Sequence, residues 1–324
     1  MFSYLVRRVL YAVPILLGVI LITFVLSFVV QSPEARARAV LGQRATPQAV
    51  ATWLSNRGFD KPRFFNTQPG EAWHDSQFFH HVVKLATFDL GVSDVSGRDL
   101  KEVFKQGAVP SLLLTVPAFF VGLLMAVCLA LYQVFVRDSL LDTAGVLIAV
   151  ALMSIPSMVY IVFGQAVLAL LFNYFPVFGF DMAGFGTLRF LLLPVALMAL
   201  MGVGGDVRLY RAVFLEEIAQ DYVRTAQAKG VPQARLLFVH VLKNGMISLI
   251  TLVVAHLPHL VMGSLLVENF FGIPGLGNTL FLAIQQSDYA TVFASVYLGS
   301  LLYIVGLILT DICYALADPR IRLS

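Results

Sequence analysis

The feature that most constrains the fold of this chain is a series of long apolar stretches. A helix needs roughly 20 apolar residues to cross about 30 Å of hydrocarbon. Six stretches reach that length, at about residues 9–30, 108–136, 144–172, 190–207, 246–268 and 291–317. Charged residues make up 13% of the chain, about half the share found in soluble domains. Because lipid requires every backbone polar group to be satisfied within its own segment, we expect an all-α integral membrane protein with six transmembrane helices.

The first apolar stretch also has an interpretation as a cleaved signal peptide. Arg7 and Arg8 precede it, and the segment EARARA at 34–39 offers small residues at a spacing typical of a cleavage site. The apolar run from 9 to 30 is, however, longer than the roughly 7–15 apolar residues of a signal peptide. We therefore predict that residues 1–30 form a retained transmembrane helix.

The distribution of Lys and Arg among the short loops predicts the orientation of the chain. Most of them fall on one side: Arg7, Arg8, Arg137, Arg208, Arg211, Arg224, Lys229, Arg235, Lys243, Arg320 and Arg322. The short loops of the other side, 173–189 and 269–290, contain only Arg189. Segment 31–107 is longer than the ~60 residues within which this rule applies, so its charges do not count. We therefore expect a multi-pass membrane protein with both termini and the loop 208–245 in the cytoplasm.

Residues 31–107 form a polar insertion after the first predicted helix, and we expect this insertion to be extracytoplasmic. The segment TPQAVATWLSNRG predicts a short helix with Thr46 as its N-cap, Pro47 in its first turn and Gly58 at its end. The segment FFHHVVKLATFDLG at 78–91 predicts a second helix, lying along the membrane face.

Side chains able to bind a metal ion gather in the segment EAWHDSQFFHH: Glu71, His74, Asp75, His80 and His81. Their spacing matches no established metal-binding pattern. We therefore interpret this segment as a solvated loop face and predict no metal site.

The sequence lacks the motifs of several nucleotide-binding and enzymatic functions. There is no GxxxxGK[ST] phosphate loop and no HExxH, GxSxG or CxxC motif, so we expect neither ATP binding by that loop nor an enzyme. The net charge of +3 is too small and dispersed to indicate a nucleic-acid partner. Cys128 and Cys313 lie in apolar runs and are expected to be small buried hydrophobes rather than a disulfide.

One organised polar segment, DYVRTAQAKGVPQARLLFVHVLKN at 221–244, interrupts the second half of the chain. Apolar residues recur around its start at steps of three and four residues, which predicts a helix over 215–229. The recurring positions are Leu215, Ile218, Ala219, Tyr222 and Ala226. Gly230 is expected to end this helix, and Pro232 suits the first turn of a second helix over about 232–244.

Periodicity alone leaves two interpretations of this polar segment open. Its basic residues favour an amphipathic loop that rests on anionic lipid headgroups. Its small residues Ala226, Ala228 and Gly230 favour close approach by the backbone of another protein.

The segment resembles the cytoplasmic EAA loop of ABC-importer permeases, whose core pattern is Glu-Ala-Ala, three residues, then Gly. Here the pattern is Arg224-Thr225-Ala226, three residues, Gly230. The fuller pattern Asp-Tyr-x-Arg-x-Ala-x-Ala-Lys-Gly is typical of the dipeptide/oligopeptide/nickel branch of that family. Further matches are YLVRRVLYAVPILLGVILITF at the start, DLGVS at 89–93, ENFFGIPGLGN at 268–278 and DPRIR at 318–322. The sequence departs from the branch at QSPEARARA, where a Pro-Gly-Asp-Pro-like stretch is usual, and at Ser248, where Pro is usual.

The resemblance implies an importer permease subunit of a bacterial inner membrane, most typically for di- or oligopeptides. It would have a five-helix core at 108–324 and a coupling loop at 215–244. The resemblance further implies a second homologous permease, two cytoplasmic ATPase subunits that hold the ATP and magnesium, and an extracytoplasmic solute-binding protein. No cofactor is expected in this chain. The residues implied in coupling to the ATPase are Asp221, Tyr222, Arg224, Thr225, Ala226, Ala228, Lys229 and Gly230.

Two histidines interrupt the fifth apolar stretch. His256 and His259 lie three residues apart, which places them on one face of a helix. Ionisable groups at that depth usually face a bundle interior or an aqueous path, so the pair is a candidate lining of the solute pathway, with Glu268 as a further candidate. Neutral histidines hydrogen-bonded to neighbouring helices are the alternative structural interpretation. The competing functional class is a proton-coupled secondary carrier that uses these histidines, although the chain shows no inverted-repeat halves.

Overall fold

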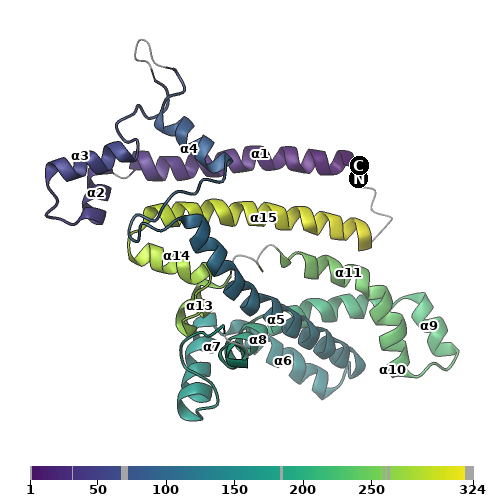
Figure 1. Cartoon of the computed structure of the whole chain (residues 1–324). Helices are drawn as coiled ribbons and strands as arrows, with labels where there is room; N and C mark the ends of the chain where they lie inside the picture. The colour runs from purple at the N-terminus through teal and green to yellow at the C-terminus, as the bar shows by residue number, and fades with distance from the viewer. Residues whose placement is uncertain are drawn as a thin grey trace. The chain divides into compact units, whose positions relative to one another are not determined.

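A computed structural model describes residues 2–30, 32–66, 72–182, 185–257, 260 and 263–317 (Figure 1). Every regular element within those ranges is helical, apart from a single isolated bridge between Val92 and Asp99. The chain divides into two compact units, Met1–Ala108 with Thr279–Val305, and Val109–Asn278 with Gly306–Leu323. The expectation of an all-α chain is therefore confirmed for the described residues.

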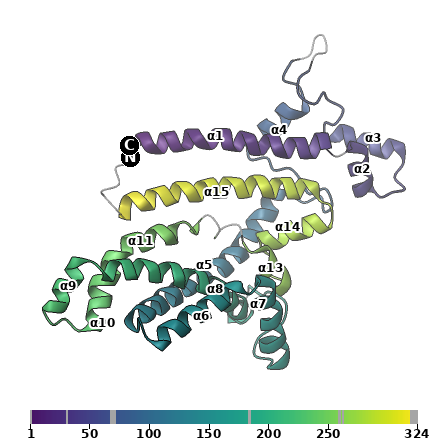
Figure 2. The same cartoon turned by 180° about the vertical axis from the view of Figure 1, so that it is seen from behind.

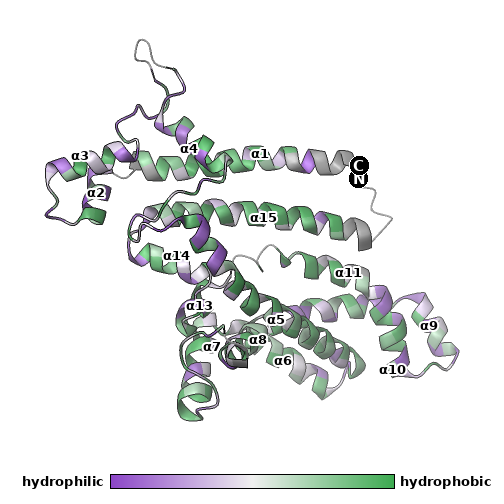
Figure 3. Cartoon of the chain, in the orientation of Figure 1, coloured by the Kyte–Doolittle hydropathy of each residue, from purple (hydrophilic) through white to green (hydrophobic). Residues whose placement is uncertain are grey.

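Among the described residues, three helices are long and apolar enough to cross a membrane: α5 (Leu100–Phe135), α8 (Phe185–Ile218) and α15 (Tyr289–Ala317). Up to six spans result if each of three bent helix pairs counts as one. The first predicted span corresponds to α1 (Phe2–Phe24), which continues as the π-helix η1 (Val25–Val30). Figure 3 shows apolar residues over most of α5 and α15, whereas hydrophilic residues gather around α9 and α10.

The third predicted span is not one straight helix. Instead, α6 (Leu140–Ser154) is followed by α7 (Ser157–Gly164) and the π-helix η2 (Gln165–Leu171), and the two halves are bent by 91°. Proline has no N–H to continue the helix and restricts the residue before it, so Pro156 leaves Ile155 extended. The Tyr160 hydroxyl donates to the carbonyl of Leu152 at 2.7 Å, which satisfies an acceptor near the break.

The boundaries predicted around the polar segment are also wrong. The helix α8 continues to Ile218, well beyond residue 207, and the single helix expected over 215–229 is divided at residues 219–220. Gln220 is extended and α9 (Asp221–Ala228) begins after it. The second helix does not end at 244, because α10 (Gln233–Arg235) continues through the π-helix η3 (Leu236–Val241) into α11 (Leu242–Val254).

The region predicted as a fifth span and a following loop is likewise rearranged. α11 ends at Val254. The next fully described helix is α13 (Leu265–Phe271), and the side chain of its N-cap residue Ser264 accepts from the amide of Val267. The expected loop at 269–290 contains α14 (Leu276–Gln285). Gly272, with φ +68°, ends α13 in the left-handed conformation that only glycine adopts readily.

In the first unit, the described part of the insertion contains three short helices, two of which were predicted. In α3 (Pro47–Asn56) the Thr46 hydroxyl accepts from the amide of Ala49, and Gly58 follows with φ +73°. The second predicted helix is α4 (Gln77–Ala86), which contacts α1 in both views (Figures 1 and 2). The unpredicted α2 (Pro33–Leu41) has Ser32 as its N-cap.

The second unit is built mainly on α6 and α8, which lie along one another in both views (Figures 1 and 2). Its larger core cluster includes Ala149 of α6, and Val203, Val207 and Phe214 of α8. Cys128 and Cys313 are free, as expected, but Cys128 is exposed in this chain rather than buried. Within the described ranges, no group of His, Cys, Asp or Glu side chains is placed to hold a metal ion. Glu71, one of the metal candidates, lies outside those ranges.

Candidate coupling surface and cleft

The helix α9 is held against the second unit by its inner face. Val223 is fully buried and Ala226 is 8% exposed. Both belong to the core cluster that contains Phe214 of α8, together with Leu236 and Val241 of η3. Burying a side chain the size of Val223 contributes about 1.5–3 kcal/mol, so α9 is fixed on the unit rather than loosely tethered.

The outer face of α9 and the turn after it are exposed. Six of the eight coupling residues lie there: Asp221, Arg224, Thr225, Ala228, Lys229 and Gly230. Arg224 and Asp221 approach only to 3.6 Å, with side chains 74% and 97% exposed. Such an exposed pair contributes little stability, so both charges remain available to a partner.

The other two residues predicted to take part in coupling, Tyr222 and Ala226, lie on the apolar face that the periodicity predicts. Ala226 points into the core, so its small side chain accommodates this chain rather than another protein. The half-buried Tyr222 donates its hydroxyl to Glu217 Oε1 at 2.6 Å. Burial, assisted by this hydrogen bond, raises the pKa of Tyr222 to about 12. Both residues therefore position α9 and are not on its outer surface.

The turn after α9 depends on glycine at one position. Gly230 has φ +77°, a conformation that costs other residues roughly 1–2 kcal/mol. Its amide donates to the carbonyl of Gln227 at 2.9 Å, and the amide of Val231 donates to Ala226 at 3.2 Å. A Cβ added at Gly230 would meet nothing within 4 Å. Gly230 is thus required by the backbone conformation, and the space around it is open.

Side-chain contacts connect this region to the ends of α5 and α6. The Gln233 amide donates to the carbonyl of Phe135, at the end of α5, at 3.1 Å. Arg211 of α8 binds Asp142 of α6 through two hydrogen bonds of 3.1 and 2.7 Å. A displacement of α9 would therefore reach three helices of the second unit.

The second unit also contains a cleft of about 370 Å³ between α5, α8 and residues near 260. Gly122 of α5 faces Ala199 of α8, since a Cβ on Gly122 would lie 3.5 Å from the Ala199 Cα. Asp206 and His256 both line this cleft, with 3.8 Å between Asp206 Oδ1 and His256 Nε2. Small residues permit helices to approach closely, and polar side chains are left between them.

Of the two histidines proposed to line a pathway, only His256 lies in the described residues. It lines the cleft, but it follows the end of α11 in a turn rather than lying on a helix. His259 is outside the described ranges. The sequence did not identify Asp206 as a cleft residue, because it lies at the end of the predicted fourth span, where a charge indicates a loop. The sequence GVGGDV, in which an acidic residue stands among small residues, could have indicated a polar side chain between closely packed helices.

Glu268, the third residue predicted to line the solute pathway, is instead enclosed by hydrogen-bond donors of this chain. It is 0% exposed and does not line the cleft. Oε1 accepts from the Ser111 hydroxyl at 2.7 Å and from the Ser264 amide at 3.1 Å. Oε2 accepts from the Asn278 amide at 2.9 Å, and the Gly277 amide is a further donor. The segment ENFFGIPGLGN thus folds back so that its own amides surround its first residue.

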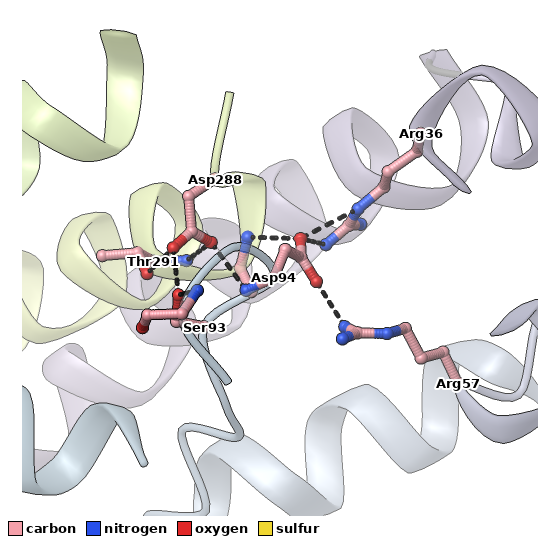
Figure 4. A network of polar contacts seen from close by, with 8 residues as sticks. Arg36, Arg57, Ser93, Asp94, Asp288 and Thr291 are labelled. Atoms are coloured by element: carbon pink, nitrogen blue, oxygen red, sulfur yellow. Dashed lines mark hydrogen bonds and ion pairs between the residues drawn. The ribbon is translucent and has the colours of Figure 1, made fainter. Parts of the chain in front are cut away.

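A polar network in the first unit surrounds Asp94 (Figure 4). Arg36 donates to Asp94 Oδ2 at 2.7 Å, and Arg57 pairs with Oδ1. The amide of Ala290 also donates to Oδ2, at 3.1 Å. The network joins the insertion to the start of α15, both of which belong to this unit.

Asp288 is the second carboxylate of this network. It accepts from the hydroxyls of Ser93 and Thr291 at 2.5 and 2.7 Å, and from the amide of Asp94 at 2.9 Å. Burial acts to raise the pKa of Asp288, but these hydrogen bonds outweigh it and lower the pKa below the usual range. The charged form is therefore stabilised, and the network is saturated by residues of this chain.

Comparison with known proteins decides the family. The family described as "Binding-protein-dependent transport system inner membrane component" matches residues 118–323, more than half of the chain. The chain belongs to this family. The N-terminal region of such membrane components matches residues 1–72 of the permease.

Relatives of this permease are similar along its whole length. It is 29% identical over 326 residues to a peptide transport system permease protein of Brucella abortus (strain 2308), with 99% of each chain covered. It is also 29% identical over 322 residues to the glutathione transport system permease protein GsiC of Salmonella typhimurium, again with 99% of each covered. The predicted resemblance to ABC-importer permeases of the dipeptide/oligopeptide branch is confirmed.

Proposed function

We propose that this permease imports di- or oligopeptides by ATP-driven alternating access, together with a second homologous permease. Two cytoplasmic ATPase subunits would supply the energy, and an extracytoplasmic binding protein would deliver the solute. The names of the relatives, which are peptide and glutathione permeases, support this solute class. The proposal includes cytoplasmic termini and a cytoplasmic α9, as the distribution of basic residues predicts.

The observation that carries the proposal is the exposed face of α9 together with the open turn at Gly230. Its inner residues are buried in the core, while its outer residues are exposed in the described part of the second unit. A rigid, polar, exposed element of this kind is suited to docking against another protein. We assign the ATPase contact to the outer face, with Arg224 and Lys229 as charged contacts and Gly230 at the tip.

Coupling then follows from how α9 is attached. An ATPase subunit that moves on binding nucleotide displaces α9, and the buried Val223 makes α9 move with the core below it. The Arg211–Asp142 and Gln233–Phe135 contacts carry the displacement to α6 and α5. The permease thus switches between two arrangements that nucleotide binding biases.

Gly230→Asp tests the assignment in the complete importer reconstituted in lipid vesicles. We expect ATP-dependent peptide uptake to fall at least about tenfold, because the charged side chain occupies the docking tip; a tenfold loss corresponds to about 1.4 kcal/mol of docking energy. Membrane insertion and assembly with the second permease should persist.

Gly97→Asp is the matched control. Gly97 is exposed, has φ +68° and also has nothing within 4 Å of an added Cβ, so it carries the same backbone strain in the first unit. ATP-dependent peptide uptake by the Gly97→Asp importer should stay near that of the unmodified importer. A normal uptake rate with Gly230→Asp, or uptake driven by a proton gradient without ATP, would contradict the proposal; the second result would favour the histidine-based carrier.

A further inference from the structure

Asp206 differs from four buried carboxylates among the described residues. Asp94, Asp142, Glu268 and Asp288 each accept two or more hydrogen bonds from this chain. The Asp206 side chain is only 22% exposed, yet its sole ionic neighbour is His256, at 3.8 Å.

That separation is too long for a hydrogen bond, so the described structure supplies no hydrogen-bond donor to this carboxylate. Buried polar groups almost always have a hydrogen-bond partner, and carboxylates within membrane helices mark functional sites. The missing donor therefore points to a ligand that provides one.

The cleft in front of Asp206 has room for such a ligand. Its volume of about 370 Å³ is at the lower end of the range for small-molecule sites, roughly 300–1,000 Å³. Gly202 also lines the cleft, close to this carboxylate: a Cβ there would be in van der Waals contact with Asp206 Oδ2, at 3.6 Å. His256 stands beside Oδ1, so Oδ2 is the oxygen left to the cleft.

The chemistry of the lining selects for a cation. Among the described lining residues there is no Lys or Arg, and the ionisable side chains are Asp206, Tyr210 and His256. The remainder is apolar or small, with the hydroxyls of Thr115 and Ser264 as further polar groups. A carboxylate in such surroundings forms a strong charge-assisted hydrogen bond with an ammonium group.

We propose that Asp206 binds the α-ammonium group of the transported peptide in this cleft. This inference rests on the proposed function, because it takes a peptide as the solute. The free amino terminus donates to Oδ2, and the first side chain of the peptide lies against Ala118, Phe119 and Met198. A peptide whose amino terminus is acetylated offers no positive charge and loses this contact.

The test measures equilibrium binding of alanyl-phenylalanine and of N-acetyl-alanyl-phenylalanine to the permease–ATPase complex in lipid nanodiscs, without the binding protein. Because the acetylated peptide lacks the charge-assisted hydrogen bond, the free-amine peptide should bind at least about tenfold more tightly. Asp206→Asn should make the two affinities equal within about threefold. Each variant is judged by the ratio of its own two affinities, so partial loss of folded protein cancels.

Asp138→Asn is the matched control, since the Asp138 side chain is 93% exposed and does not line the cleft. It should keep the preference for the free amine. The inference is overturned if the unmodified complex shows no preference, binds neither peptide, or keeps its preference after Asp206→Asn. It is also overturned if Asp206→Asn weakens both peptides equally, which would assign Asp206 to a contact within the assembly. Uptake of alanyl-phenylalanine by the complete importer tests the proposed function separately.

Discussion

Replacing Glu268 by Gln tests whether this residue holds the segment 263–278 together. The substitution keeps the size of the side chain but exchanges one carboxylate oxygen for an NH₂ group. Donors surround both oxygens: the Ser111 hydroxyl and the Ser264 amide at Oε1, and the Asn278 amide at Oε2. In either orientation of the new amide, an NH₂ group faces at least one backbone N–H.

The cost follows from the number of donors left without an acceptor. Each buried donor that loses its acceptor costs about 1–3 kcal/mol. Relaxation is restricted, because a Cβ added at Gly263 or Gly275 would already overlap the carboxylate oxygens. One or two orphaned amides therefore give a loss of about 2–5 kcal/mol in the free energy of unfolding.

The loss is measurable as the thermal unfolding midpoint of the purified permease complex in one detergent. A loss of that size lowers the midpoint by roughly 5–15 °C. Glu216→Gln is the control, since Glu216 is exposed at the end of α8 and should change the free energy of unfolding by less than about 0.5 kcal/mol.

Peptide-binding affinity should stay unchanged for the Glu268→Gln protein that remains folded. An unchanged midpoint would refute the assignment of Glu268 as a structural residue. A changed peptide affinity with a normal midpoint would return Glu268 to the solute pathway.

Two more predictions concern the charges of the two units. Arg211→Ala leaves the nearly buried Asp142 without its bidentate partner, so we expect about 3–5 kcal/mol less folding stability, measured as a lower midpoint. For His81, burial, with smaller contributions from Lys84 and Arg36, lowers the pKa from 6.5 to about 4. Below pH 6.5 the unfolded chain binds a proton that the folded chain does not. Stability is therefore lost as the pH falls from 6.5 to 4, by up to about 3 kcal/mol, and unfolding midpoints between pH 7 and 4 should show it.

Each of these predictions has its own control. Arg208→Ala removes a guanidinium that contacts only the sulfur of Met153 among the described residues, and it should lower the midpoint much less than Arg211→Ala. His81→Phe should abolish most of the pH dependence between 6.5 and 4. Equal effects of the two arginine variants, or an unaltered pH profile with His81→Phe, would contradict these assignments.

Local sequence signals predicted local structure well. The helix α3 lies between Thr46 and Gly58 as expected, because a cap and a left-handed turn depend on neighbouring residues only. Gly230 ends α9 for the same reason. Long-range features were not accessible in this way. In the part of α8 that continues past residue 207, Arg211 binds Asp142, which is 69 residues away in sequence.

The candidate site shows the same division. The outer face of α9 follows from the spacing of its polar residues, and six of the eight predicted residues lie there. The structural role of Glu268 cannot be predicted from such spacing, because its hydrogen-bond donors come from Ser111 as well as from its own segment. The position of Asp206 in a cleft cannot be predicted from its neighbours in sequence, because residues of both α5 and α8 form that cleft.

The inner and outer faces of α9 have no residue in common. Val223 and Ala226 supply the packing, whereas Asp221, Arg224 and Lys229 supply the surface. If the outer face of α9 binds the ATPase as proposed, the choice of ATPase and the stability of the fold can vary independently. Exchanging these surface residues for those of another permease should then change which ATPase binds, with the fold left intact. Hybrid importers become accessible by replacing a few surface side chains rather than a whole subunit.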